Sequence, residues 1–194
     1  MTDVRRRATW PLLVAVVVIV VLLVAVVVVA VIGGRGAVRT SADVAVGGCV
    51  VVNDRGNDAV AVDAVGCTGD GMTFYVAARP TGRAGCPAVT DPARLAPDLR
   101  VELGGDAICL VPDLRQGRCY LLPAARDGSS AARRAARYER KGCSTVAGTA
   151  DSPIYAVTRR ADGATRVDCP AGQIGWGTGR PRPIAYCLTP TRAG

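Results

Sequence analysis

Eight cysteines carry the clearest chemistry in this chain, and they fall into two sets of four. The sets are Cys49, Cys67, Cys86, Cys109 and Cys119, Cys143, Cys169, Cys187. The residues around each cysteine of the first set resemble those around its counterpart in the second. The third cysteine of each set precedes a proline, and the fourth lies in an apolar run that ends in proline. This repeat predicts two tandem copies of one structural unit, each closed by its own disulfides.

Several disulfide connectivities satisfy this repeat. If pairing stays within a copy and the copies are equivalent, three connectivities remain. We favour joining the first cysteine to the second and the third to the fourth, because this ties neighbouring strands together and fastens a long loop to the closing strand. The favoured pairs are Cys49–Cys67, Cys86–Cys109, Cys119–Cys143 and Cys169–Cys187. A nested arrangement, with the first cysteine bound to the fourth, is the main alternative.

Other uses of cysteine fit the sequence poorly. The chain contains no histidine, which excludes the usual Ser-His and Cys-His nucleophiles and histidine-ligated zinc. Zinc held by cysteine alone, or a redox dithiol, requires closely spaced cysteine pairs. The closest cysteines, Cys109 and Cys119, lie in different copies. We therefore expect no metal and no cofactor.

Carboxylates offer the only enzymatic alternative. Asp54, Asp58 and Asp63 lie near one another in the sequence, as do Glu102 and Asp106. Paired carboxylates are the catalytic groups of most glycoside hydrolases. These residues have no counterparts in the second copy, which favours turn and loop positions. A cell-wall glycan hydrolase is therefore the alternative function, and we expect no enzyme.

The most concentrated charge is a basic segment in the second copy. It consists of Arg133, Arg134, Arg137, Arg140 and Lys141. The whole chain carries a net charge of +8, so an anionic lipid surface or an anionic wall polymer is a candidate partner. Nucleic acid is not expected outside a membrane. The alternative is a solvated strand and turn without a partner.

A second candidate ligand surface lies in a glycine-rich stretch, residues 172–180. Trp176, with Arg180 and Arg182, is a candidate for contact with a ligand there. The alternative is that Trp176 packs over its own loop. The stretch follows no long strand and opens no helix, so it does not qualify as a phosphate-binding loop.

The segment from Trp10 to Ile32 predicts a transmembrane helix. Its 23 residues carry no charge, and as a helix they would span about 35 Å, enough to cross a hydrocarbon core of about 30 Å. A cleaved signal peptide is the alternative, with Arg5, Arg6 and Arg7 as its basic region. Every cysteine follows the span, which places the C-terminal part in an oxidising space outside the membrane and the N-terminus in the cytoplasm.

The predicted fold is mostly β with minor α. We expect a cytoplasmic stub (residues 1–9), the membrane span (10–32), a tether (33–46) and two small disulfide-rich β modules, the first copy (47–115) and the second copy (116–194). Aromatic residues are only 4% of the chain, so each small core needs disulfides to be stable.

Four pairs of matching segments predict strands. The pairs are 49–52 with 119–122, 60–67 with 136–143, 73–79 with 153–159, and 106–112 with 183–190. A helical turn is expected at 131–135, capped by Ser129 or Ser130, with a strand leading into Cys143. A short helix is also expected from Thr90, ending before Pro97. Almost no linker separates the copies, so we expect them to pack together.

The cysteine motifs resemble those of LppU-like and septum-formation-type envelope modules of actinobacteria. The resemblance covers most of residues 47–190, twice over. It implies exported, membrane-anchored or lipid-linked modules that are mostly β and have no defined biochemical activity. That family carries Asp directly before the first cysteine, where the two copies here have Gly48 and Arg118. It also carries Pro-His after the second cysteine, whereas this chain has no histidine. No site residue is therefore carried over.

The sequence as a whole favours a non-enzymatic module anchored in the membrane. Its partners are the lipid bilayer, through Trp10–Ile32, and envelope or septal proteins. The exported part would present a binding surface in the cell envelope.

Overall fold

The computed structural model describes residues 14–22, 36–57, 59–69, 71–82, 84–86, 99–123, 130–144 and 153–191. Residues 14–22 form a helix with exposed side chains, and residues 36–194 form a separate compact unit. Within the described ranges, no helix is both long and apolar enough to cross a membrane. Residues 10–13 and 23–32 of the expected span lie outside the described residues.

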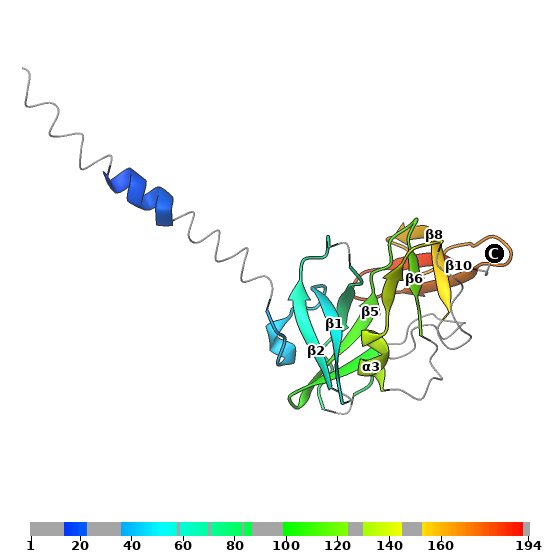
Figure 1. Ribbon diagram of the computed structural model, residues 1–194, viewed down its shortest axis with the longest axis horizontal. Coiled ribbons are helices and arrows are strands. Elements are labelled where there is room, and N and C mark those ends of the chain that lie inside the picture. The colour runs from blue at the N-terminus through cyan, green and yellow to red at the C-terminus, as the bar shows by residue number, and fades with distance from the viewer. Residues whose placement is uncertain are drawn as a thin grey trace, which may run out of the picture. The chain divides into compact units, whose positions relative to one another are not determined.

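The compact unit contains two antiparallel sheets of five strands each (Figure 1). The first sheet consists of β1 (Cys49–Gly56), β2 (Ala59–Val65), β3 (Phe74–Ala78), β4 (Leu99–Leu103) and β5 (Asp106–Pro112), in the order β2-β1-β3-β5-β4. The second consists of β6 (Cys119–Leu121), β7 (Glu139–Lys141), β8 (Ile154–Asp162), β9 (Ile174–Thr178) and β10 (Ile184–Pro190), in the order β7-β6-β8-β10-β9. The two orders are equivalent, so the predicted internal repeat and the mostly β fold are confirmed.

All four disulfides follow the favoured pairing. Cys49–Cys67 and Cys119–Cys143 join the start of the first strand of a copy to the end of its second strand. Cys86–Cys109 and Cys169–Cys187 fasten a loop to the closing strand of the same copy. No cysteine is left free, and the nested arrangement is wrong.

The two copies share one hydrophobic core. Buried residues of the first sheet, such as Val50 and Val76, belong to the same cluster as Leu122, Tyr186 and Leu188 of the second copy. Apolar side chains on one face of each sheet can be removed from water only by packing against another layer. The expectation that the copies pack together is therefore confirmed.

The segment predicted as a tether is partly folded onto the first sheet, at residues 36–44. The Val38 amide donates to the Val62 carbonyl over 2.8 Å, and the Ala64 amide donates to the Gly36 carbonyl over 2.9 Å. Val38 and Val44 are both buried in the core. A short 3-10 helix, η1 (Ser41–Asp43), lies between the two valines.

Strands β4 and β9 had no counterpart in the sequence prediction. The glycines around Trp176 suggested a loop, whereas residues 174–178 pair with β10 along the whole of β9. Gly177 is required there because a Cβ at this position would lie 2.2 Å from the Thr165 carbonyl oxygen. The helix expected from Thr90 lies outside the described residues.

The predicted helical turn is present as α3 (Ala131–Ala136). The Ser130 hydroxyl caps it by accepting a hydrogen bond from the Arg133 amide over 3.2 Å. Although α3 belongs to the second copy, it packs against β1, β2 and β4 of the first sheet. A helix of six residues is only about 9 Å long, and β2 and β4 are opposite edges of that sheet. The first sheet must therefore curl around α3.

Candidate functional site

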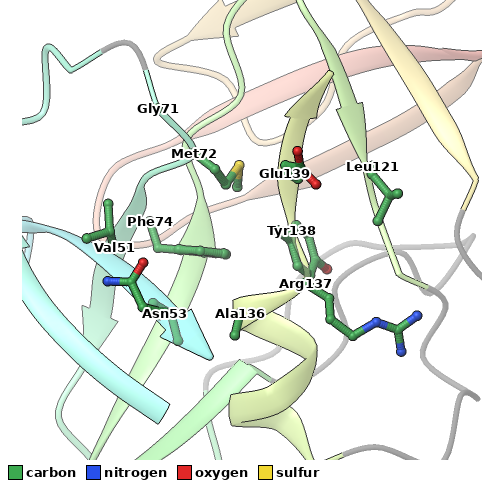
Figure 2. A pocket seen from close by; sticks show the side chains of 11 residues that line it. Val51, Asn53, Gly71, Met72, Phe74, Leu121, Ala136, Arg137, Tyr138 and Glu139 are labelled. Atoms are coloured by element: carbon green, nitrogen blue, oxygen red, sulfur yellow. The ribbon is translucent and has the colours of Figure 1, made fainter. Parts of the chain in front are cut away.

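A pocket of about 620 Å³ lies where the two copies meet, and we call it the inter-copy groove. The first copy contributes residues 51–53 of β1 together with Gly71, Met72 and Phe74. The second copy contributes Leu121 at the end of β6 and residues 136–139, which lead from α3 into β7. Figure 2 shows these side chains around a common space. Neither copy alone supplies both walls.

The floor of the groove is apolar and firmly packed. Phe74 is 1% exposed and meets Tyr138 edge to face, with ring centroids 5.4 Å apart. Such a pair is worth about 0.5–1.5 kcal/mol beyond the area that it buries. Because one ring belongs to β3 and the other follows α3, this contact holds the two walls in a fixed relation.

Three polar side chains complete the groove. Asn53 donates from its amide nitrogen to the Asp63 carboxylate over 3.1 Å, and Glu139 pairs with Lys141 at 2.6 Å. Arg137 lies on the opposite side of the groove from Asn53 (Figure 2). The lining thus carries one positive and one negative side chain and has no net charge. An apolar floor with a few polar groups suits the binding of a molecule better than proton transfer.

The side chains of the basic segment differ in exposure, and their joint contact with an anionic surface stays a prediction. Arg134 is only 9% exposed, Arg133 and Arg137 are half-buried, and Arg140 is exposed. Lys141 is paired with Glu139. The helical turn of α3 directs consecutive arginines in different directions, because successive residues of a helix lie about 100° apart around its axis.

The residues of the second candidate ligand surface, Trp176, Arg180 and Arg182, differ in their exposure. Trp176 is 3% exposed and stacks on Tyr186 of β10, with ring centroids 5.1 Å apart. Arg182 donates to the Tyr75 hydroxyl over 2.6 Å and lies 4.8 Å above that ring. Arg180 is exposed. Trp176 is therefore a core residue, which favours the alternative that it packs within the protein.

The carboxylates that suggested a hydrolase are held in separate local contacts. Asp54 accepts from the Gly56 amide, Asp63 accepts from Asn53, Glu102 pairs with Arg100, and Asp106 accepts from Ser41. Asp58 lies outside the described residues.

Three pockets in the described part of the chain hold at most one carboxylate each. Within the same ranges, no group of three or more His, Cys, Asp or Glu residues is placed to hold a metal ion.

The junction between the copies holds a buried ion pair that the sequence analysis missed. Asp113 is 3% exposed, and its carboxylate lies 2.6 Å from Nη1 of Arg160 on β8. The same nitrogen donates to the Leu114 carbonyl over 3.0 Å, and Nη2 reaches Asp162 at 3.1 Å. No local pattern marks this pair, because its partners come from segments far apart in the sequence.

Two buried tyrosines fix the same junction. The Tyr186 hydroxyl donates to the Pro112 carbonyl and accepts from the Leu114 amide, both over 3.4 Å. The Tyr120 hydroxyl accepts from the Arg115 amide over 3.0 Å. Burial raises the pKa of both tyrosines above the ordinary value of 10.0, because the ionised form would lose its hydration. These polar groups are engaged within the protein, so the junction is structural.

No protein-family model matches the chain, and neither does any curated protein or solved structure. The resemblance to LppU-like envelope modules therefore rests on the cysteine motifs alone. The inter-copy groove is the feature of the described residues that bears most directly on function.

Proposed function

We propose that this protein is a membrane-anchored, extracytoplasmic, non-enzymatic module that holds an envelope component in the inter-copy groove. The groove is the observation that carries the proposal. Its volume of about 620 Å³ lies within the range of about 300–1,000 Å³ that is usual for ligand sites. Its apolar floor and few polar groups match the ordinary composition of such sites.

The anchor and the location follow from the sequence. In this proposal Trp10–Ile32 crosses the bilayer, the N-terminus is cytoplasmic and residues 33–194 are outside. The four disulfides support it, since disulfides persist in oxidising compartments. Protease added to intact spheroplasts should then degrade the part of the protein that follows the span, and complete protection until lysis would show that the orientation is wrong.

Binding is favoured over catalysis by the distribution of carboxylates. A glycan hydrolase needs two carboxyl groups about 5–9.5 Å apart across the scissile bond. The inter-copy groove has a single carboxylate, Glu139, and this group is paired with Lys141. Envelope or septal components are the partners that we propose, in line with the resemblance of the cysteine motifs.

Gly71 provides the test of the groove. It is exposed, it lines the groove, and a Cβ built on it has no atom within 4 Å. Gly71→Trp should therefore obstruct the groove without disturbing the core. Gly85 is equally exposed and open but does not line the groove, so Gly85→Trp is the matched control.

The experiment is a comparative capture from envelope extracts by the full chain in detergent. The unchanged protein and Gly85→Trp should retain a common component, and Gly71→Trp should retain at least about tenfold less, a loss of about 1.4 kcal/mol. Equal retention by all three proteins would remove the groove as the binding site.

A further inference from the structure

In the part of the chain that the structure describes, β1 has one side that another strand covers only at its start. It pairs with β2 along its whole length, from Cys49 to Gly56. On its other side it pairs with β3 only at Cys49 and Val50, opposite Tyr75 and Phe74. From residue 51 onward, no strand lies beside β1 on this side in the part of the chain that the structure describes.

The peptide groups of Val52 are directed to this open side. The Gly48 carbonyl accepts from the Val76 amide over 2.9 Å, so residue 48 is directed toward β3. In an antiparallel ladder, alternate residues direct both backbone groups to the same neighbour. Residues 50 and 52 are therefore directed toward the β3 side as well, whereas Val51 and Asn53 are directed toward β2.

The pairing of β2 agrees with this assignment. Ala64 and Val62 bond to residues 36 and 38 on the outer side of β2, so the residues between them are directed inward to β1. Asp63 and Ala61 are the residues opposite Val51 and Asn53.

The open edge faces the inter-copy groove. Residues 51, 52 and 53 are consecutive, and all three line it. Successive side chains of a strand point to opposite faces, so a cavity over one face would be lined by alternate residues. A lining of consecutive residues means that the groove lies against the edge of the strand.

We infer that the inter-copy groove binds an extended peptide, which adds to the first sheet as a strand beside β1. This inference rests on the proposed function and names the ligand class of the same site. In this mode of recognition, main-chain hydrogen bonds supply affinity and alternate side chains enter pockets. The peptide would pair with Val52 and place an apolar side chain against Met72 and Leu121.

The charge and polarity of the groove favour a peptide over the other candidates. Its lining carries Arg137 and Glu139, one charge of each sign, and so does not match a polyanion. An acyl chain suits the apolar floor but leaves the Val52 amide and carbonyl without partners, and burying unpaired backbone groups is costly. A peptide in β conformation would contact the apolar floor with its side chains and bond the Val52 backbone groups with its main chain.

Among the described residues, β6, the counterpart of β1 in the second copy, has no such open side. In the second copy, β6 pairs with β8 at all three of its residues, opposite Ala156, Tyr155 and Ile154. One peptide per chain is therefore expected.

A phage-displayed library of short random peptides, panned against the full chain in detergent, tests the inference. Recovered peptides should bind one to one, with little change in affinity between low and high salt. Gly71→Trp should weaken them by at least about tenfold, and Gly85→Trp by less than about twofold.

Two readouts report the strand geometry itself. Methylation of successive peptide nitrogens should weaken binding at every second position only, because alternate amides of an added strand face away from β1. Amide hydrogen exchange at Val52 should slow on binding, while exchange at Val51 and Asn53, which already pair with β2, should change little.

The inference is overturned if no library peptide is retained, if Gly71→Trp has no effect, or if methylation shows no alternation. Dodecanoic acid and wall-glycan fragments serve as parallel probes. If one of these binds and is lost in Gly71→Trp while no peptide binds, the peptide is excluded and the proposed function stands. If neither the probes nor the envelope extract distinguish Gly71→Trp from Gly85→Trp, the peptide inference and the proposed function are both excluded.

Discussion

The two copies share a strand order and a disulfide pattern but distribute their residues differently. In the first copy, the first two strands have eight and seven residues and are joined by a turn. In the second, the corresponding strands β6 and β7 have three residues each, and the chain between them forms α3. A hairpin in one copy has thus become, in the other, a helix that packs on its neighbour.

The third strand differs in the opposite sense. It has five residues in β3 and nine in β8. A long first strand beside a short third strand leaves an open edge in the first copy, and a short first strand beside a long third strand leaves none in the second. The two copies share one scaffold, and the groove lies where these segments differ between them.

The largest expected effect comes from the ring contact that joins the copies. Phe74→Ala should reduce the free energy of unfolding by about 3–5 kcal/mol, because it leaves a cavity beneath Tyr138. Chemical denaturation measures the loss, and Phe74→Leu should cost less. Two separate transitions in the unchanged protein would contradict a core shared by both copies.

The disulfides test whether the copies are equivalent. Cys49→Ser with Cys67→Ser, and Cys119→Ser with Cys143→Ser, should each cost about 3 kcal/mol in the chain-entropy description. The sequence separations are 18 and 24, so the two losses should differ by only about 0.3 kcal/mol. Thermal unfolding of the two double variants makes the comparison, and a difference above about 1 kcal/mol would show that the copies contribute unequally.

The ion pair at the junction should have a smaller effect. Asp113→Asn should cost about 2 kcal/mol, the range for hydrogen bonds to charged groups, because Asp113 is buried against Arg160. Asp162→Asn is the matched control, since it removes a carboxylate from the same arginine. Asp162 has a side chain that is 60% exposed, and its loss should cost less than about 1 kcal/mol. Equal losses in urea unfolding would mean that burial at the junction does not matter.

The smallest effect concerns alkaline pH and belongs to the second copy. The raised pKa values of Tyr120 and Tyr186 mean that these groups ionise in the unfolded chain before they ionise in the folded one. The free energy of unfolding should therefore be unaffected below about pH 10 and fall as the pH rises above it. Tyr120→Phe with Tyr186→Phe should flatten this decline. An unchanged slope in the double variant would assign the decline to other groups.

Much of the scaffold was predictable because the eight cysteines are spread along both copies and mark corresponding positions in them. The repeat, α3 and four of the five strand correspondences follow from local sequence, and the disulfide pairing was the favoured one of the three connectivities that the repeat allows. The correspondence between β4 and β9 did not, since glycines in β9 lower its strand propensity and are present for a close approach to Thr165.

The site was not predictable in the same way. The basic segment was a candidate because its charges are close in sequence, whereas the structure divides them between α3 and β7 and buries Arg134. The groove joins β1 to the residues that follow α3, and the open edge of β1 depends on where β3 begins. Such features arise from pairing between distant segments, which no local pattern records.

The buried junction also bears on how fast a ligand binds. Asp113 and Leu114 are fixed by Arg160 and Tyr186, so the copies are joined without a hinge. The ligand of the proposed function would enter a groove whose walls are already in place, so association should take place in one step. Its rate should rise linearly with ligand concentration, with a rate constant of about 10⁵–10⁷ M⁻¹s⁻¹ and no slower closing phase.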